Sequence, residues 1–205
     1  MKIIFAVSVT IFASMATTLA IAEESSSAPA EAVISKATSV CQNCHRPQGD
    51  SVSATFPRLN GQQADYIAAQ LKSFRSQSRS DPHARAYMWG MASQLDDGMI
   101  DGLAKYFAAQ KPTPPQSGGA LAADGKTIYM NGADAQNIPA CQACHGEHAE
   151  GNSVIPRLAG QHAYYLKSQL EAFRSTLRDN DVMHANTKDM TNSQIEALVS
   201  YLAND

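Results

Sequence analysis

The four cysteines of this 205-residue chain all lie in two copies of the pattern Cys-x-x-Cys-His, which read CQNCH and CQACH. Two intervening residues bring both sulfurs to neighbouring edges of one flat ligand, and the histidine that follows can turn its imidazole under the centre of that ligand. This spacing is typical of covalent haem c attachment, with the histidine as an axial iron ligand. The residues are Cys41, Cys44 and His45 in the first copy, and Cys141, Cys144 and His145 in the second.

Three other kinds of site use the same residue types. A zinc site needs four ligands, and each copy supplies three with no fourth cysteine nearby. A thioredoxin-like redox pair would need a strand-to-helix setting in an α/β domain, which the surrounding pattern lacks. A structural disulfide would not require a histidine after both second cysteines. The repeated pattern therefore favours two covalently bound haem c groups per chain.

The sixth coordination position of each iron separates an electron carrier from a ligand-binding protein. A methionine there closes the site and raises the reduction potential. Aligning Tyr106 with Tyr201 carries Met88 onto Met183. We therefore expect Met88 and Met183 to be the second axial ligands. The methionines without a partner, which we expect to fill the core, are Met91, Met99 and Met190.

The other four histidines have no equivalents between the two copies. His83 and His184 lie near the two methionines and could ligate instead, but their positions do not match, so we expect them to be solvated. His148 and His162 lack partners in the first copy and are expected at the surface.

A proline and an arginine follow each motif at nearly the same distance. A ligating histidine normally donates its second N–H to a carbonyl, and the rigid backbone at Pro57 and Pro156 suits that role. Both prolines could also serve only as turn residues before the next helix. Arg58 and Arg157 could pair with haem propionates or remain exposed.

The motifs sit in a duplicated chain. FPRLNGQQADYIAAQLKSFRS from Phe56 recurs as IPRLAGQHAYYLKSQLEAFRS from Ile155, and the closing segments of the two halves also match. Apolar residues recur at steps of three and four, which predicts helices, and alternating strand patterns are absent. Asp96 and Thr191 are predicted N-caps, the latter in a capping box with Gln194. The stretch from Lys111 to Asp124, rich in proline and glycine, is predicted to be a linker.

The N-terminal segment, the domain bounds and the net charge give three further expectations. Residues 1–22 have the pattern of a secretory signal peptide, and an uncleaved anchor is the alternative. Residues 23–116 and 117–205 are the predicted domains, each a small helical bundle around one covalent haem. The net charge of −3 and the absence of a basic stripe argue against nucleic acid as a partner.

Together these residues resemble the cytochrome c4 family of dihaem class I cytochromes c. The resemblance rests on CQNCH and CQACH, on PRLNGQ and PRLAGQ before a tyrosine-containing helix, on Met88 and Met183, and on the closing LAKYFA and LVSYLA. It implies an all-α fold of two tandem class I cytochrome c domains, with haem propionate edges facing across the interface. One departure stands out: the segment that ends at the ligand methionine is four residues longer in the first half, QSRSDPHARAYM against TLRDNDVM.

The family is periplasmic, sometimes peripherally membrane-associated, and passes electrons from quinol-oxidising complexes towards terminal oxidases, so a soluble carrier rather than an enzyme is expected. The alternatives are the cytochrome subunit of a flavocytochrome c sulfide dehydrogenase and a small dihaem peroxidase. Charge adds one expectation. Nine basic and nine acidic residues lie in 23–116, against six and ten from 117 onward, so the second haem should have the lower potential.

Overall fold

The computed structural model describes Met1 and residues 28–116 and 118–203, and within them the chain is helical and forms no strand beyond isolated bridges. The first half contains α1 (Ala30–Lys36), the π-helical turn η1 (Ala37–Cys41), α2 (Gln42–His45), α3 (Ala64–Arg75), a second π-helical turn η2 (Ala84–Met88), α4 (Trp89–Ala92) and α5 (Asp97–Ala108). The second contains α6 (Ala122–Asn131), the 3₁₀ turn η3 (Asp134–Gln136), α7 (Gln142–His145), α8 (Ala163–Arg174), α9 (Asp181–Thr187) and α10 (Asn192–Leu202). The predicted signal peptide lies outside the residues that the structure describes.

Side-chain caps fix where the closing helices begin. The Asp96 carboxylate accepts a hydrogen bond of 2.7 Å from the Met99 N–H at the start of α5. At α10, Thr191 and Gln194 form the predicted capping box. Both caps satisfy backbone N–H groups that a helix cannot satisfy itself.

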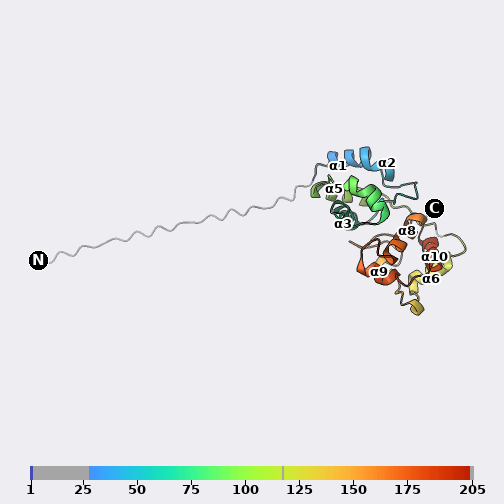
Figure 1. The fold of residues 1–205 in the computed structure, drawn as a ribbon. Helices are drawn as coiled ribbons and strands as arrows, with labels where there is room; N and C mark the ends of the chain where they lie inside the picture. Colours follow the sequence, from blue (N-terminus) through green and yellow to red (C-terminus); the bar gives the residue numbers. More distant parts are fainter. Residues whose placement is uncertain (2–27, 117, 204–205) are drawn as a thin grey trace.

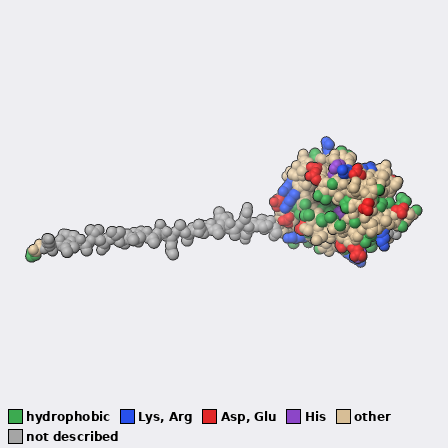
Figure 2. Space-filling view, turned by 90° about the horizontal axis from the view of Figure 1, so that it is seen from below, with side chains coloured by type: hydrophobic (Ala, Val, Ile, Leu, Met, Phe, Trp, Pro, Cys, Tyr) green, Lys and Arg blue, Asp and Glu red, His purple; other side chains and the backbone are tan. Residues whose placement is uncertain are grey.

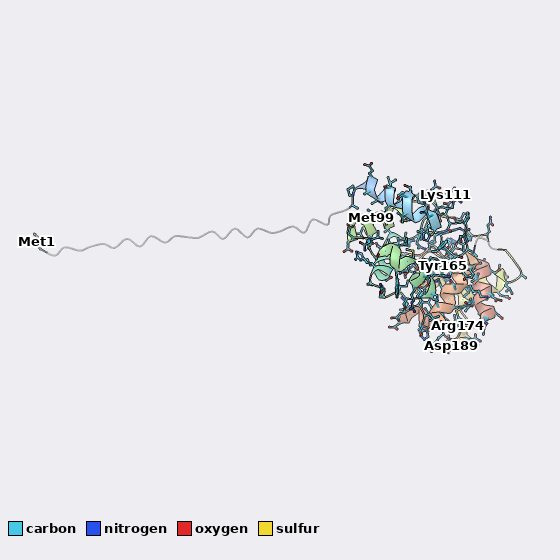
Figure 3. All side chains as sticks on the ribbon, turned by 45° about the horizontal axis from the view of Figure 1, so that its top comes forward. Met1, Met99, Lys111, Tyr165, Arg174 and Asp189 are labelled. Carbon is cyan, nitrogen blue, oxygen red and sulfur yellow. The ribbon has the colours of Figure 1, made fainter. Side chains whose placement is uncertain are left out.

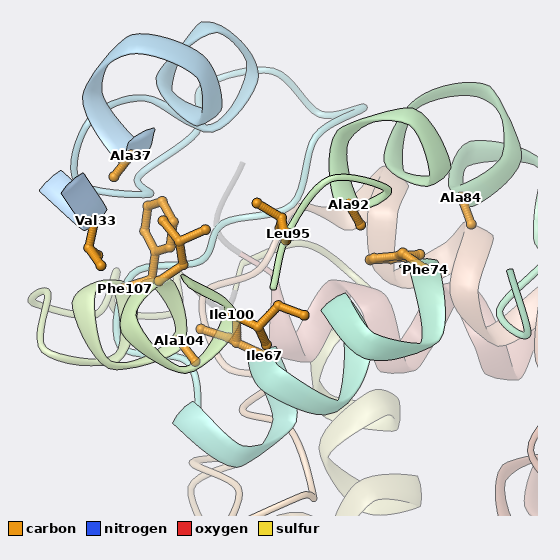
Figure 4. Packing of buried hydrophobic residues seen from close by; sticks show 11 residues of the cluster. Val33, Ala37, Ile67, Phe74, Ala84, Ala92, Leu95, Ile100, Ala104 and Phe107 are labelled. Carbon is orange, nitrogen blue, oxygen red and sulfur yellow. The ribbon is translucent and has the colours of Figure 1, made fainter. Parts of the chain in front are cut away.

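In each half the first and last helices cross closely, at a point where one of them has a small residue. Gly102 of α5 faces Val33 of α1, and Gly125 of α6 lies directly against the carbonyl of Ala197 in α10. Any side chain at Gly125 would push α6 and α10 apart. Figure 4 shows the core of the first half, where Ile100, Ala104 and Phe107 of α5 pack between α1 and α3.

The segment between the halves is held against the protein. Asn60 Nδ2 donates to the carbonyl of Lys111 and to Thr113 Oγ1 at 2.8 and 3.0 Å, and the Gln116 N–H donates to the carbonyl of Ala203 at 3.1 Å. The predicted linker was too long at its end, because α6 already begins at Ala122. The glycines just before α6 made its first turn resemble part of the linker. Whether 116/117 is the domain boundary stays a prediction.

The two halves lie against each other along a contact surface that includes α3 and α8 (Figure 1). We call this surface the seam. Tyr165 of α8 lies where they meet (Figure 3), and its hydroxyl accepts a hydrogen bond of 3.3 Å from Arg79 of the first half. Within the described residues, no helix combines the length and apolar character that crossing a membrane requires.

Candidate haem-binding sites

Each histidine of the CxxCH motifs is buried and oriented by a proline. His45 Nδ1 donates to the carbonyl of Pro57 at 2.8 Å, and His145 Nδ1 donates to the carbonyl of Pro156 at 3.0 Å. Each histidine is only 7 % exposed. With Nδ1 engaged, Nε2 is the nitrogen left to bind a metal ion.

Burial also sets the protonation state of these imidazoles. Removal from water lowers the pKa of His45 and of His145, and the hydrogen bonds to the proline carbonyls oppose this only in part. Both rings are therefore neutral at physiological pH. The neutral ring is the form in which Nε2 can donate its lone pair to iron.

The cysteines lie on helical turns next to these histidines. Cys44 and Cys144 are exposed, while Cys41 and Cys141 are half-buried beside the two hydrophobic cores. Burial raises the pKa of the Cys41 thiol, and it raises that of Cys141 to about 11. A dithiol catalyst needs a lowered thiol pKa, so the electrostatics do not suit thioredoxin-like chemistry.

The two methionines are half-buried and lie on different kinds of helical turn. Met88 ends the π-helical turn η2 and packs against the core of the first half. Met183 lies in the first turn of α9, where its N–H donates to Asn180 Oδ1 at 2.8 Å. The aromatic rings of His45, Phe56 and Tyr87 form a contact chain, at centroid distances of 6.1 and 5.3 Å, that joins the CxxCH turn to the residue before Met88.

The two arginines after the prolines lie at the seam between the halves. Arg58 Nη1 donates to the carbonyl of Gly160 at 2.8 Å, so this arginine is not freely exposed. Arg157 Nε is buried and has no hydrogen-bond partner among the described residues. A buried guanidinium N–H without an acceptor suits a carboxylate such as a haem propionate. Propionate contacts for both arginines stay a prediction.

A reciprocal set of hydrogen bonds joins the halves at these arginines. Gln161 accepts from the N–H of Arg58 at 2.8 Å and donates to its carbonyl at 2.9 Å. Gln62 does the same for Arg157, at 2.7 and 2.9 Å. The glutamine of each half thus holds the backbone of the arginine that follows the proline in the other half.

The prediction for His162 was wrong. This histidine is 2 % exposed, and its Nε2 donates to the carbonyl of Ser51 in the other half at 2.9 Å. The matching bond runs from Gln63 Nε2 to the carbonyl of Glu150 at 2.8 Å. The repeat placed histidine opposite glutamine, which hid the fact that both side chains can donate from the same place.

The other three histidines differ in how far they are exposed. His148 is exposed, as expected. His83 and His184 are half-buried rather than fully solvated, and His184 Nδ1 donates to the carbonyl of Phe173 at 2.9 Å.

A buried polar cluster at the seam was not predicted. The Arg79 guanidinium donates to Gln70 of its own half and to Gln169 of the other, both at 2.8 Å. Arg178 repeats the pattern with the same two glutamines, at 2.8 Å to Gln70 and 2.6 Å to Gln169. In both halves the glutamine and the arginine recur at the same spacing, and this repetition was the sequence signal from which the cluster could have been predicted.

Among the described residues, the first half alone adds a buried carboxylate to this cluster. Asp81 accepts from Arg79 Nε at 2.8 Å, and Asn180 stands at the equivalent position. Burial alone would raise the pKa of Asp81, but Arg79 and then Arg178 hold that pKa below its usual value.

The residues fit a haem in each half. A flat apolar macrocycle needs an apolar lining, two cysteines and two axial donors. In the first half, Leu59, Leu71 and Trp89 are partly buried around the same core as Cys41 and Met88. Figure 2 shows hydrophobic side chains gathered around a hollow, with charged side chains towards the rim. When bound, the haem iron supplies one-electron exchange, while the protein orients the histidines and excludes water.

The family model for cytochrome c matches residues 122–204. Cytochrome c-552 of Acidithiobacillus ferridurans is 41% identical over 172 residues, covering 82% of this chain and 74% of that protein. Cytochrome c4 of Azotobacter vinelandii is 36% identical over 174 residues, covering 80% and 83%. A thiosulfate dehydrogenase electron acceptor of Stutzerimonas stutzeri (strain A1501) is 37% identical over 177 residues, covering 82% and 80%.

Solved structures agree with these relatives. Cytochrome c4 of Acidithiobacillus ferrooxidans matches with a TM-score of 0.77 and 40% identity, covering 81% of this chain and 99% of that one. Thiosulfate dehydrogenase from Marichromatium purpuratum matches with a TM-score of 0.74 and 29% identity, covering 85% and 40%. With two CxxCH motifs in two tandem helical units, the chain belongs to the cytochrome c4 family, whose members are electron carriers with two covalently bound haem c groups.

Proposed function

We propose that this cytochrome carries electrons in the periplasm through two six-coordinate haems. His45 and Met88 would ligate the first iron, and His145 and Met183 the second. The observation that supports this most directly is the repeated donor geometry, in which each buried histidine commits Nδ1 to a proline carbonyl. Two closed irons that change only oxidation state suit electron transfer.

Optical spectra of the purified protein test the ligand sets. We expect two haems per chain and a far-red methionine–iron band in the ferric state. Met88→Ala and Met183→Ala should each remove about half of that band. A high-spin spectrum in the unchanged protein would contradict the proposal and direct attention to the peroxidase alternative.

Electron delivery to a terminal oxidase, from a quinol-oxidising donor, is the role that we propose for the carrier. Export to the periplasm by residues 1–22 belongs to the same proposal. Fractionation of cells that express the full chain would test export, since the mature haem protein should leave with the periplasmic contents. Retention with washed membranes would favour the anchor instead.

A second candidate role is electron acceptor for a dehydrogenase of sulfur compounds. It is favoured by similarity to the thiosulfate dehydrogenase electron acceptor and to the thiosulfate dehydrogenase structure. A flavoprotein partner, as in a flavocytochrome c sulfide dehydrogenase, remains the alternative expected from the sequence. Stopped-flow reduction by a thiosulfate dehydrogenase and by a quinol-oxidising complex, each with its substrate, would separate the roles. The physiological donor should reduce this protein much faster than the other donor does.

A further inference from the structure

The two methionine-bearing turns differ more than their shared place in the repeat suggests. In the first half, the helical segment starts after Asp81 and reaches Met88 only in its second turn, through the π-helical turn Ala84–Met88. In the second half, Met183 lies in the first turn of α9, directly after its N-cap Asn180. The four extra residues of the first half are taken up in this segment.

Side chains hold the backbone of Met183 from both sides. Asn180 Oδ1 accepts from its N–H at 2.8 Å, and Thr187 Oγ1 donates to its carbonyl at 2.7 Å. His184, the next residue, donates from Nδ1 to the carbonyl of Phe173 on α8 at 2.9 Å. Moving Met183 would break a helix cap and two further hydrogen bonds.

The turn of Met88 has no such supports. Within the described part of the chain, no side chain hydrogen-bonds the backbone of Met88. The cap at the start of the segment, from the Ala84 N–H to Asp81 Oδ1, measures 3.4 Å, which is long for an N–H···O bond. The nearest firm anchor is Trp89, whose Nε1 donates to the carbonyl of Arg79 at 2.7 Å.

A π-helical turn has a nearby alternative. It holds one residue more than an α-helical turn, it is rare, and it is frequently found at functional sites. If the extra residue leaves the turn, the backbone returns to α-helical hydrogen bonds. The side chains of the turn then rotate by about 100° around the helix axis. For Met88, such a shift would carry the thioether away from its previous direction.

The outer side of this turn has room for the shift. Arg85, Ala86 and Tyr87 are exposed. An open groove of about 560 Å³ borders the turn, and its lining includes Arg85, Trp89 and, from the second half, Leu177. An outward movement of the turn would enter this groove, at the cost of the ring contact between Tyr87 and Phe56.

We propose that the sixth position of the first haem is an exchangeable ligand site, which Met88 yields to small neutral nitrogen donors, while Met183 keeps the second haem closed. The inference rests on the proposed assignment of both methionines as axial ligands. In the exchange, one iron–sulfur bond breaks and one iron–nitrogen bond forms, with no change in oxidation state. The molecule would then combine an electron-transfer haem with a ligand-binding one.

Imidazole, added to the ferric protein, tests the proposal. In Met183→Ala the far-red band comes from Met88 alone, and in Met88→Ala it comes from Met183 alone. We expect imidazole to remove the Met88 band at a concentration at least tenfold lower than the Met183 band. Equal concentrations, or the reverse order, would overturn the inference and leave the ligand assignment intact.

The cap provides a matched pair of variants. In the Met88→Ala background, Asn180→Ala should make the Met183 band several-fold more sensitive to imidazole, because the cap no longer holds its turn. Thr191→Ala removes a similar cap from α10, which carries no proposed ligand, and should change nothing. An effect of Thr191→Ala as large as that of Asn180→Ala would count against the mechanism.

Proton NMR of the unsubstituted ferric protein gives the same comparison if a variant fails to fold. Each ligating methionine has its own shifted methyl signal, and one should disappear well before the other as imidazole is added. Absence of the far-red band from either starting variant, with no shifted methyl signal for that methionine, would overturn the ligand assignment together with the inference.

Discussion

Arg46 and Gly146 follow the histidine of each motif, and both adopt a backbone conformation that suits glycine. Arg46 has φ 65° and ψ 161°, and Gly146 has φ 85° and ψ 159°. A side chain in this region costs about 1–3 kcal/mol. We expect Arg46→Gly to raise the free energy of unfolding by about 1 kcal/mol, after the greater freedom of glycine in the unfolded chain is subtracted. Guanidinium unfolding of the holoprotein measures it, and Gly146→Ala should have the opposite sign.

Asp81 makes the buried cluster sensitive to acid. Because its pKa is held below the usual value, its stabilising effect is complete above about pH 4 and is lost as the pH falls through the lowered pKa. Asp81→Asn should cost about 3 kcal/mol at neutral pH, since it removes the buried carboxylate that balances the charge of Arg79. The natural Asn180 indicates that asparagine fits at this place.

Unfolding of both proteins over a range of pH checks this expectation. The difference in unfolding free energy between Asp81→Asn and the unchanged protein should shrink below about pH 4. A difference that stays constant across that range would show that the carboxylate charge is not responsible.

At the scale of elements, the glycines at the helix crossings should respond differently to a methyl group. Gly125→Ala pushes against backbone and should cost about 1–3 kcal/mol. Gly102→Ala pushes against Val33, so Val33→Ala should relieve part of its cost and give a favourable coupling in a double-mutant cycle. Gly90→Ala, whose new methyl would meet no atom within 4 Å outside its own helical turn, is the control and should be neutral or stabilising.

Helices and haem motifs could be predicted because each leaves a local pattern. The caps at Asp96 and Thr191, and the histidine–proline pairs, follow from residue type and spacing. The π-helical turn that ends at Met88 could not be predicted, since only the four-residue difference in length marks it.

The seam was hidden for a different reason. Gln70 and Gln169 lie within apolar stripes of ordinary helices, and nothing local says that another half covers them. Their role depends on how two distant segments pack, as does the burial of His162.

At the scale of the whole molecule, the seam should decide whether the halves unfold together. Gln62→Ala with Gln161→Ala removes four hydrogen bonds that hold one half to the other. We expect one thermal transition in the unchanged protein and two in the double variant, because each half keeps its own core. Calorimetry measures this, and a single transition in both would show that other contacts suffice.

The uneven charge of the halves gives a prediction for the two potentials. The excess of acidic residues after residue 117 should favour ferric iron in the second haem and so give it the lower potential. A redox titration followed by NMR can assign each step to its haem. The gap should narrow as salt is added, because surface charge is screened.

The reciprocal glutamine bonds have a consequence for the history of the molecule. When residue i meets j and j meets i, the contact has the form of a two-fold interface between identical subunits. If a single-domain ancestor already had this contact, it made the contact as a homodimer, and gene duplication and fusion then joined the two copies. Once joined, the copies no longer had to change together. The carboxylate of Asp81 opposite Asn180, and the loose turn of Met88 opposite the capped turn of Met183, are differences that a symmetric dimer could not have acquired.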